Sequence, residues 1–291
     1  FTIIGDDVLL DGVRFDFFKN GTAKVPFPTD RLIYASGVNG LTIRNFVVIN
    51  TSPEGVPRRV KLQLIKIDNS RNIFLQNSFA DDIVDMVWAD HCGNVTVHGN
   101  RMINGGTITT FANGSESLRH YDNWSRSVVY QCVWRGGSPD PSRKAPKVPL
   151  GSAKIVTRGI TPNDPGWIDH TQGVFDVSVQ NNYAEYGTVL CWGNKGRQTI
   201  ISGNTARFMK DYSYGSEGGE NLIFANNISI NSAVAGIMCM YWGEKVLITG
   251  NLVVVRHEPF NSAFTDKPES FFQGQFIRLH HGPENPEDEY G

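Results

Sequence analysis

The chain has few cysteines, few charges and no long apolar run, and each shortage excludes a class of protein. Its four cysteines, at positions 92, 132, 191 and 239 of 291 residues, lack the spacing of a zinc site. Charged residues make up only 19% of the chain and the formal net charge is −2, which argues against a nucleic-acid partner. The longest apolar run, Ala233 to Trp242 with Gly236 inside it, is too short to span a membrane.

A short pattern recurs along the chain: an apolar–x–apolar run, one or two polar residues, and then asparagine. Further copies, some of them looser, lie upstream and end at Asn45, Asn77 and Asn100. The asparagines at positions 182, 204, 227 and 251 are 22, 23 and 24 residues apart. A repeat of this length is one supersecondary unit that cannot bury its own apolar face alone, so the copies are expected to stack.

Each copy reads as a short strand between turns, because alternating residues are bounded by Gly, Asn and Asp. No helical spacing separates the copies, and the frame of a leucine-rich repeat is missing. We therefore predict an all-β chain, a parallel β-helix with one coil per repeat, forming a single domain over residues 1–291. The asparagine suits a turn position, since it tolerates left-handed geometry and can bond to the next coil.

Three segments depart from the repeat, near residues 136–155, 161–166 and 257–273. We predict that they are inserted loops, which in a solenoid tend to project from the binding face. The four cysteines fall at different coil phases or two coils apart, so they are predicted to be free thiols. Strand-like residues at Phe1 and at Ile277 lead us to expect that the protein continues beyond both ends of this chain.

A column of carboxylates, imidazoles and large rings lies four to eight residues upstream of the apolar strands. Residues at equal phase in stacked coils lie ~4.8 Å apart, so this column is predicted to form one groove. Aromatic faces stack on sugar C–H surfaces and carboxylates accept hydroxyl hydrogen bonds, which suits a polysaccharide. The predicted catalytic residues are Asp122, Asp169, Glu217, His120 and His170, and the predicted substrate-binding residues are Trp88, Asp90, His91, Tyr121, Trp192, Tyr214, Arg197 and Trp242.

Paired carboxylates can also perform acid and base chemistry at a glycosidic oxygen. Asp122 and Asp169 are predicted to lie one coil apart, ~5 Å, which is the spacing of retaining glycosidases. Asp169 and Glu217 are predicted to lie two coils apart, ~10 Å, at or slightly beyond the inverting spacing. Any one of these side chains is explained more simply as a solvated outer residue, whereas the whole column favours a binding groove.

The pattern as a whole resembles the right-handed parallel β-helices of the pectate lyase-like superfamily, over nearly the whole chain. The run from Asp81 to Asp85 is similar to a calcium-binding run of that family. The resemblance therefore implies Asp81 and Asp85 as metal ligands, with Ca²⁺ as cofactor if the chain is a lyase. It also implies Lys144 as a substrate-contacting residue where the family has its arginine base. The family's Trp-Ile-Asp-His strand reads Phe74-Leu-Gln-Asn77 here and lacks the acid.

Three functions stay open at this point. The first is a glycoside hydrolase that cleaves within a polysaccharide by means of carboxylates. The second is a polysaccharide lyase that acts on a uronic-acid polymer by β-elimination. The third is a glycan-binding β-helix without catalysis, of the tailspike or adhesin type. All three imply a polysaccharide partner and an extracellular, periplasmic or virion-surface location, with a homotrimer as a further option and neither nucleic acid nor membrane as partner.

Overall fold

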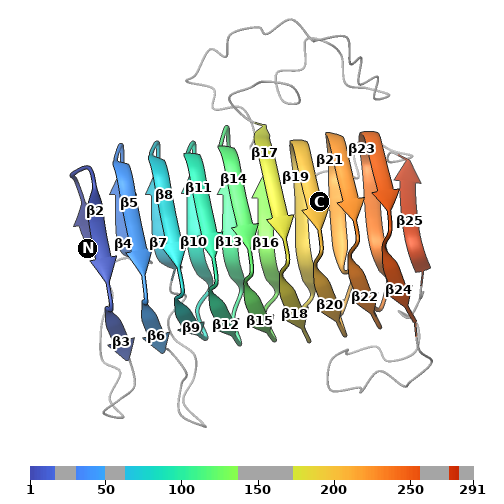
Figure 1. Cartoon of the computed structure of the whole chain (residues 1–291), viewed down its shortest axis with the longest axis horizontal. Helices are drawn as coiled ribbons and strands as arrows, with labels where there is room; N and C mark the ends of the chain where they lie inside the picture. Colours follow the sequence, from blue (N-terminus) through green and yellow to red (C-terminus); the bar gives the residue numbers. More distant parts are fainter. Residues whose placement is uncertain (17–30, 50–62, 137–172, 256–274, 282–291) are drawn as a thin grey trace, which may run out of the picture.

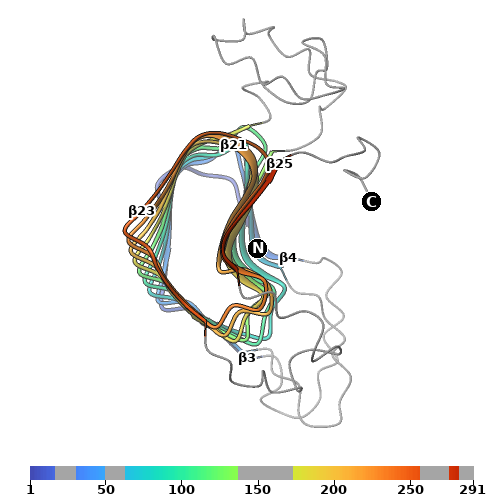
Figure 2. The ribbon, with the colours of Figure 1, turned by 90° about the vertical axis from the view of Figure 1, so that its right-hand side faces the viewer.

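The computed structural model describes residues 1–16, 31–49, 63–136, 173–255 and 275–281. Its 25 strands stack into a row of coils along one axis (Figure 1). Viewed along that axis, the coils lie over one another around a common interior (Figure 2). The predicted fold, an all-β right-handed parallel β-helix, is confirmed by these ladders of parallel strands. The predicted loops near 136–155, 161–166 and 257–273 lie almost entirely outside the described residues.

Each complete coil contributes one segment to each of three parallel sheets. The first sheet contains β1 (Thr2–Ile3), β4 (Arg31–Ser36), β7 (Gln63–Asp68), β10 (Asp85–Asp90), β13 (Thr107–Ala112), β16 (Tyr130–Arg135) and β25 (Gln275–His281). The second contains β2 (Val8–Asp11), β5 (Asn39–Arg44), β8 (Arg71–Gln76), β11 (Gly93–His98), β14 (Glu116–Tyr121) and β17 (Val174–Gln180). The third contains β3 (Arg14–Asp16), β6 (Val47–Ile49), β9 (Phe79–Asp81), β12 (Arg101–Ile103), β15 (Trp124–Arg126), β18 (Tyr183–Glu185), β20 (Thr205–Arg207), β22 (Ile228–Ile230) and β24 (Leu252–Val254).

Three long strands join the first sheet to the second without a break. They are β19 (Val189–Ser202), β21 (Tyr214–Ala225) and β23 (Ala235–Thr249). The first half of β19 pairs with β16, and its second half pairs with β17. In earlier coils a turn at Asn69 or His91, both with positive φ, separates the two sheets. Among the described coils, one strand therefore continues through this corner only in the later ones, whereas the earlier coils have a hydrogen-bonded turn there.

The recurring asparagine forms a buried ladder between the second and third sheets. The backbone N–H of Asn182 donates to Oδ1 of Asn204 at 2.9 Å, and Asn204 donates to Asn227 at 3.0 Å in the same way. Each side-chain amide also donates to the next asparagine, so buried polar groups find partners within the ladder. The ladder comprises Asn100, Asn123, Asn182, Asn204, Asn227 and Asn251.

The structure corrects the assignment of the first two asparagines of the repeat. Asn45 and Asn77 are not rungs of this ladder but occupy the position just before it, with φ of 54° and 49°. In the next coil that position is Gly99, and Ser78 stands where Asn100 stands. Left-handed backbone favours asparagine and glycine, so two adjacent positions of one turn both select asparagine.

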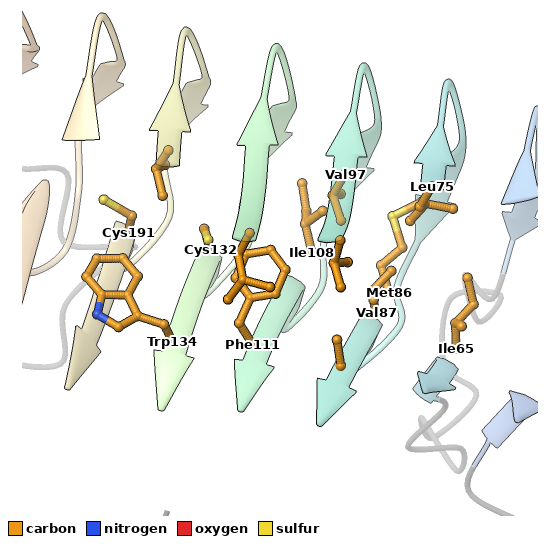
Figure 3. Close-up of a cluster of buried hydrophobic side chains, with 14 of the residues drawn as sticks. Ile65, Leu75, Met86, Val87, Val97, Ile108, Phe111, Cys132, Trp134 and Cys191 are labelled. Atoms are coloured by element: carbon orange, nitrogen blue, oxygen red, sulfur yellow. The ribbon is translucent and has the colours of Figure 1, made fainter. Parts of the chain in front are cut away.

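The interior is filled by stacked apolar rows, in which large and small residues complement each other. Phe111, Trp134 and Gly193 occupy one row of adjacent strands, and a Cβ on Gly193 would collide with the Trp134 ring. Figure 3 shows Trp134 and Phe111 among the buried side chains. The cysteines are free and buried, as predicted, and burial raises the pKa of each thiol. However, Cys132 and Cys191 are neighbours in adjacent strands, so their predicted separation was wrong.

Among the residues that the structure describes, no helix has the length and hydrophobicity to traverse a bilayer.

Candidate functional site on the first sheet

Two rows of side chains run across the outer side of the first sheet, which we call the outer face. The register of β7, β10, β13, β16, β19 and β21 fixes both rows. One row contains Lys66, Trp88, Thr110, Val133, Trp192 and Gly215. The other contains Asp68, Asp90, Ala112, Arg135, Asn194 and Glu217. The structure thus brings Trp88, Trp192, Asp90 and Glu217 to one face, as the sequence predicted.

The richest part of the outer face lies over β16, β19 and β21. The Arg135 guanidinium carbon lies 5.4 Å from the centre of the Trp192 ring. The rings of Tyr130 and Trp192 lie 6.1 Å apart with an interplanar angle of 30°. Glu217 is half-buried and occupies the row of Arg135, two strands away. A carboxyl group, a cation and two rings therefore share one patch, which we call the β21 patch.

Two carboxyl groups of the β21 patch have raised pKa values. Burial raises the pKa of Glu217, the nearby Trp192 indole and the charge of Arg135 oppose the rise, and the charge of Asp211 adds to it. Trp192 Nε1 has no hydrogen bond of normal geometry among the described residues, so burial is the dominant effect on the pKa of Glu217. Burial also raises the pKa of Asp211, against a backbone N–H at Tyr212 and the charge of Arg278. Carboxyls held in this way stay protonated to higher pH than solvated ones.

An apolar floor holds these carboxyl groups in partial burial. Val189, Tyr212, Ala235 and Met238 form a buried cluster separate from the main core, with Tyr130 and Trp192 packed against it. A Cβ on Gly215 would collide with the Tyr212 ring, so glycine at this position lets the ring lie against the sheet. Burial raises the pKa of Tyr212 well above its usual value, and the charges of Glu217 and Asp211 contribute. Both acids therefore lie close to this ring.

The outer face over β7 and β10 is built differently. Asp68 lies 3.7 Å from the Lys66 ammonium, and Asp90 Oδ1 lies 2.6 Å from His91 Nδ1. Trp88 is half-buried, and its neighbours in the row are Lys66 on β7 and Thr110 on β13. The predicted residues Trp88, Asp90 and His91 thus lie together, with each acid beside a basic group.

Three predicted residues lie on another sheet, which corrects the predicted column. His120, Tyr121 and the residue after them, Asp122, belong to β14 and its turn in the second sheet. His120 is fully buried, its Nδ1 lies 3.1 Å from Thr109 Oγ1, and burial lowers its pKa to about 3. Tyr121 stacks on His98 at 4.4 Å, and Asp122 lies 3.5 Å from the same imidazole. None of the three reaches the outer face of the first sheet.

Tyr214 and Arg197 also lie elsewhere than predicted. Tyr214 is buried, and its hydroxyl donates to the carbonyls of Asn204 and Ile228, so it is a core residue. Arg197 lies in the second-sheet half of β19, where its Nε is 3.3 Å from Glu220.

Asp169, His170 and Lys144 lie outside the described residues, and the side chain of Trp242 is not described either. The two predicted carboxylate spacings, Asp122 to Asp169 and Asp169 to Glu217, both involve Asp169 and therefore stay predictions.

The residues around Asp81 and Asp85 do not fit a calcium ion. Asp81 Oδ1 accepts from Asn104 at 3.2 Å on the third sheet, and Asp85 Oδ2 accepts from Gln63 at 3.3 Å on the first. Calcium requires six to eight oxygen ligands. In the part of the chain that the structure describes, no group of three His, Cys, Asp or Glu side chains could hold a metal ion.

Four residues of this site, Tyr130, Arg135, Asp211 and Tyr212, were not predicted from the sequence. Tyr130 and Arg135 begin and end β16, which follows a rung, Asn123, that was not recognised as a copy of the repeat. Counting forward from Asn123 would have located this strand, since β19 follows the rung Asn182 at the same distance.

The fold and this face together define a right-handed parallel β-helix with an acidic and aromatic outer face. The structure is similar to an exopolygalacturonase from Thermotoga maritima, with 13% identity, a TM-score of 0.43, and coverage of 78% of this chain and 55% of that one. It is similar to PfbA, a surface adhesin of Streptococcus pneumoniae, with 10% identity, a TM-score of 0.48, and coverage of 77% and 62%. A family 28 exopolygalacturonase of Yersinia enterocolitica matches with 11% identity, a TM-score of 0.47, and coverage of 86% and 47%.

This chain therefore spans roughly half of the length of those solved structures, or somewhat more. No protein-family model matches the chain, and no curated protein is similar to it in sequence.

Proposed function

We propose that the chain is a glycoside hydrolase that cleaves within a polysaccharide at the β21 patch. One observation carries this proposal: Glu217 and Asp211 are two carboxyl groups, both with pKa values raised by burial, beside the rings of Trp192 and Tyr130. Perturbed carboxyls on an accessible face are typical of acid–base catalysis. Asp169 and His170, which sequence analysis placed in the same groove, stay predictions.

In the proposed reaction, protonated Glu217 donates its proton to the glycosidic oxygen as the bond to the anomeric carbon breaks. Asp211, as carboxylate, assists the attack of water on that carbon, and the proton of the water passes to Asp211. Trp192 and Tyr130 supply ring faces for sugar C–H groups, and the guanidinium of Arg135 donates N–H hydrogen bonds to the oxygens of sugar hydroxyls. A polymer substrate implies an extracellular location.

One experiment distinguishes the proposed hydrolase from its two alternatives, a polysaccharide lyase and a glycan-binding protein without catalysis. The protein is incubated with a panel of neutral and uronic-acid polysaccharides, and new reducing ends and ultraviolet absorbance are measured in parallel. Hydrolysis releases reducing ends without absorbance, because no double bond forms. Absorbance that rises with the reducing ends would instead establish β-elimination and refute the hydrolase. Binding to a polymer without new ends would leave a glycan-binding β-helix and also refute it.

A further inference from the structure

The outer side of the third sheet carries a second surface, built from arginines and aromatic rings. Arg101, Trp124 and Tyr183 form one row on β12, β15 and β18, and Arg126, Glu185 and Arg207 form the next row on β15, β18 and β20. Tyr186 and Phe208 follow at the turn after each of the last two strands. We call these eight residues the arginine–aromatic strip.

The rings of the strip order two of its guanidinium groups. Tyr186 and Phe208 stack with ring centres 5.1 Å apart and an interplanar angle of 9°. The Arg126 guanidinium lies 5.3 Å from the Tyr186 ring centre, and that of Arg207 lies 5.4 Å from the Phe208 ring centre. A guanidinium packed on a ring keeps its N–H groups free in its own plane, so it can still bind an anion.

The backbone at Tyr186 and Phe208 is strained, which sets them apart from the rest of their column. Their φ angles are 56° and 55°, in the left-handed region that bulky residues rarely adopt. The same turn position is Asn104, Ser127 and Asn231 in other coils, with φ between 52° and 55°. Strain of this kind persists where the surrounding structure or a function requires it.

The charge of the strip is unbalanced. Three arginines accompany one carboxylate, Glu185, which lies 3.6 Å from Arg126 Nε and also accepts from the Tyr183 hydroxyl at 3.0 Å. The Arg126 side chain is 57% exposed, and Arg101 is exposed as well. Arg207 Nε is buried without an acceptor among the described residues, and Arg207 Nη1 donates to the Tyr183 hydroxyl at 3.4 Å. This excess of cations stands out in a chain whose net charge is −2.

We infer that the arginine–aromatic strip binds an anionic polysaccharide, with carboxylate or sulfate groups on Arg126 and Arg207. Charge complementarity selects a polyanion, and carboxylates and sulfates accept the paired N–H donors of arginine. The coil spacing places Arg126 and Arg207 two strands apart, ~10 Å, a separation that suits successive charges along one polymer. This surface lies on a different sheet from Glu217, so it holds a polymer without taking part in its cleavage.

The test replaces the two aromatic residues at the turn after β18 and β20. The double variant Tyr186→Asn, Phe208→Asn installs the residue type that Asn104 and Asn231 already use in the same column, so it is expected to fold with an unfolding midpoint close to that of the parent. Both variant and parent carry Glu217→Gln, so that cleavage does not consume the probe. Binding to polygalacturonate and dextran sulfate is measured by affinity electrophoresis, with neutral dextran as the reference polymer.

We expect the asparagine pair, and likewise Arg126→Gln with Arg207→Gln, to weaken binding to the anionic polymers at least fivefold. Arg71→Gln is the matched control, because Arg71 is an exposed arginine beside one carboxylate, Glu116 at 3.2 Å, on the second sheet. Equal losses in the control and the strip variants would overturn the inference, as would no binding by the parent. Tighter binding to single-stranded DNA than to either polymer would also overturn it, since stacked rings and arginines suit both. Absent hydrolysis with intact strip binding would refute only the proposed function.

Discussion

The outer face of the first sheet presents acids in two places, over β7 and β10 and over β21, and surrounds them differently. Asp68 and Asp90 lie beside Lys66 and His91. Glu217 has no ion pair within the described residues and lies near Asp211 and an apolar floor, where burial raises its pKa. The same position of the coil therefore carries an ion-paired acid in one place and a readily protonated acid in the other. The surroundings, more than the residue type, decide which acid can do proton chemistry.

The largest expected effect comes from exchanging the acid for its amide in both places. Glu217→Gln removes the proposed proton donor and is expected to lower kcat by roughly 10²–10⁴-fold. Asp90→Asn makes the same chemical change in the same row of the outer face, and is expected to leave kcat nearly unchanged. Rates are compared on whichever polymer the wild-type protein cleaves. Equal losses in both variants would erase the functional difference between the two places.

A smaller effect is expected from the two tryptophans of the neighbouring row. Trp192→Ala removes the ring that contacts Tyr130 and Arg135, and is expected to raise KM by roughly 3–10-fold, the worth of one aromatic contact. Trp88→Ala is the matched change over β10. A larger rise in KM for Trp88→Ala would move the centre of the binding site toward the amino-terminal coils. The measurement is initial rate against polymer concentration.

The smallest effect concerns stability and pH. The pKa of Glu217 is higher in the folded chain than in the unfolded one, so the unfolded state ionises first as the pH rises, and ionisation favours unfolding. Glu217→Gln is therefore expected to raise the free energy of unfolding at neutral pH slightly, because the group is partly exposed, and to leave it unchanged below the unfolded pKa. Denaturant titrations at neutral and acidic pH check this. A stabilisation that persists in acid would point to packing instead of ionisation.

The same shift predicts the pH dependence of catalysis. Glu217 is proposed to act in its protonated form, so activity is expected to fall as the pH rises through its raised pKa. An activity that increases through neutral pH would exclude Glu217 as the acid.

The sequence predicts the fold well because the repeat places asparagine and glycine at turn and ladder positions that few other residues tolerate. Left-handed turns select asparagine or glycine, and the buried ladder selects asparagine, so the coil boundaries can be read directly. The outer residues Trp88, Asp90, Trp192 and Glu217 were found because their coils keep a constant distance to the rung asparagine.

The rest of the site was missed because an error in the phase of a coil reverses which side chains of its strand are assigned to the inside and to the outside. Side chains alternate between the two faces, so an error of one residue exchanges inside for outside. Tyr214 and His120 were predicted to face a groove and are buried. Because Asn123 was not recognised as a rung, the strand β16 had no assigned phase, and Tyr130 and Arg135 were not placed on the outer face. Asp211 precedes β21 in a turn, where no repeat position identifies it.

The asparagine ladder has a direction, and that direction makes it vulnerable to chemical ageing. From Asn100 to Asn227, each rung amide donates one N–H to the next rung on the carboxyl-terminal side, while its other N–H donates to a backbone carbonyl. Each rung Oδ1 accepts from the coil on the amino-terminal side. Hydrolysis of one amide to a carboxylate would leave an acceptor without a donor, facing the Oδ1 of the next rung inside the protein. Such a lesion at Asn204 would place two acceptors against each other and bury a charge. Only at Asn251, after which the described ladder has no further rung, would the same damage leave the amide chain itself intact.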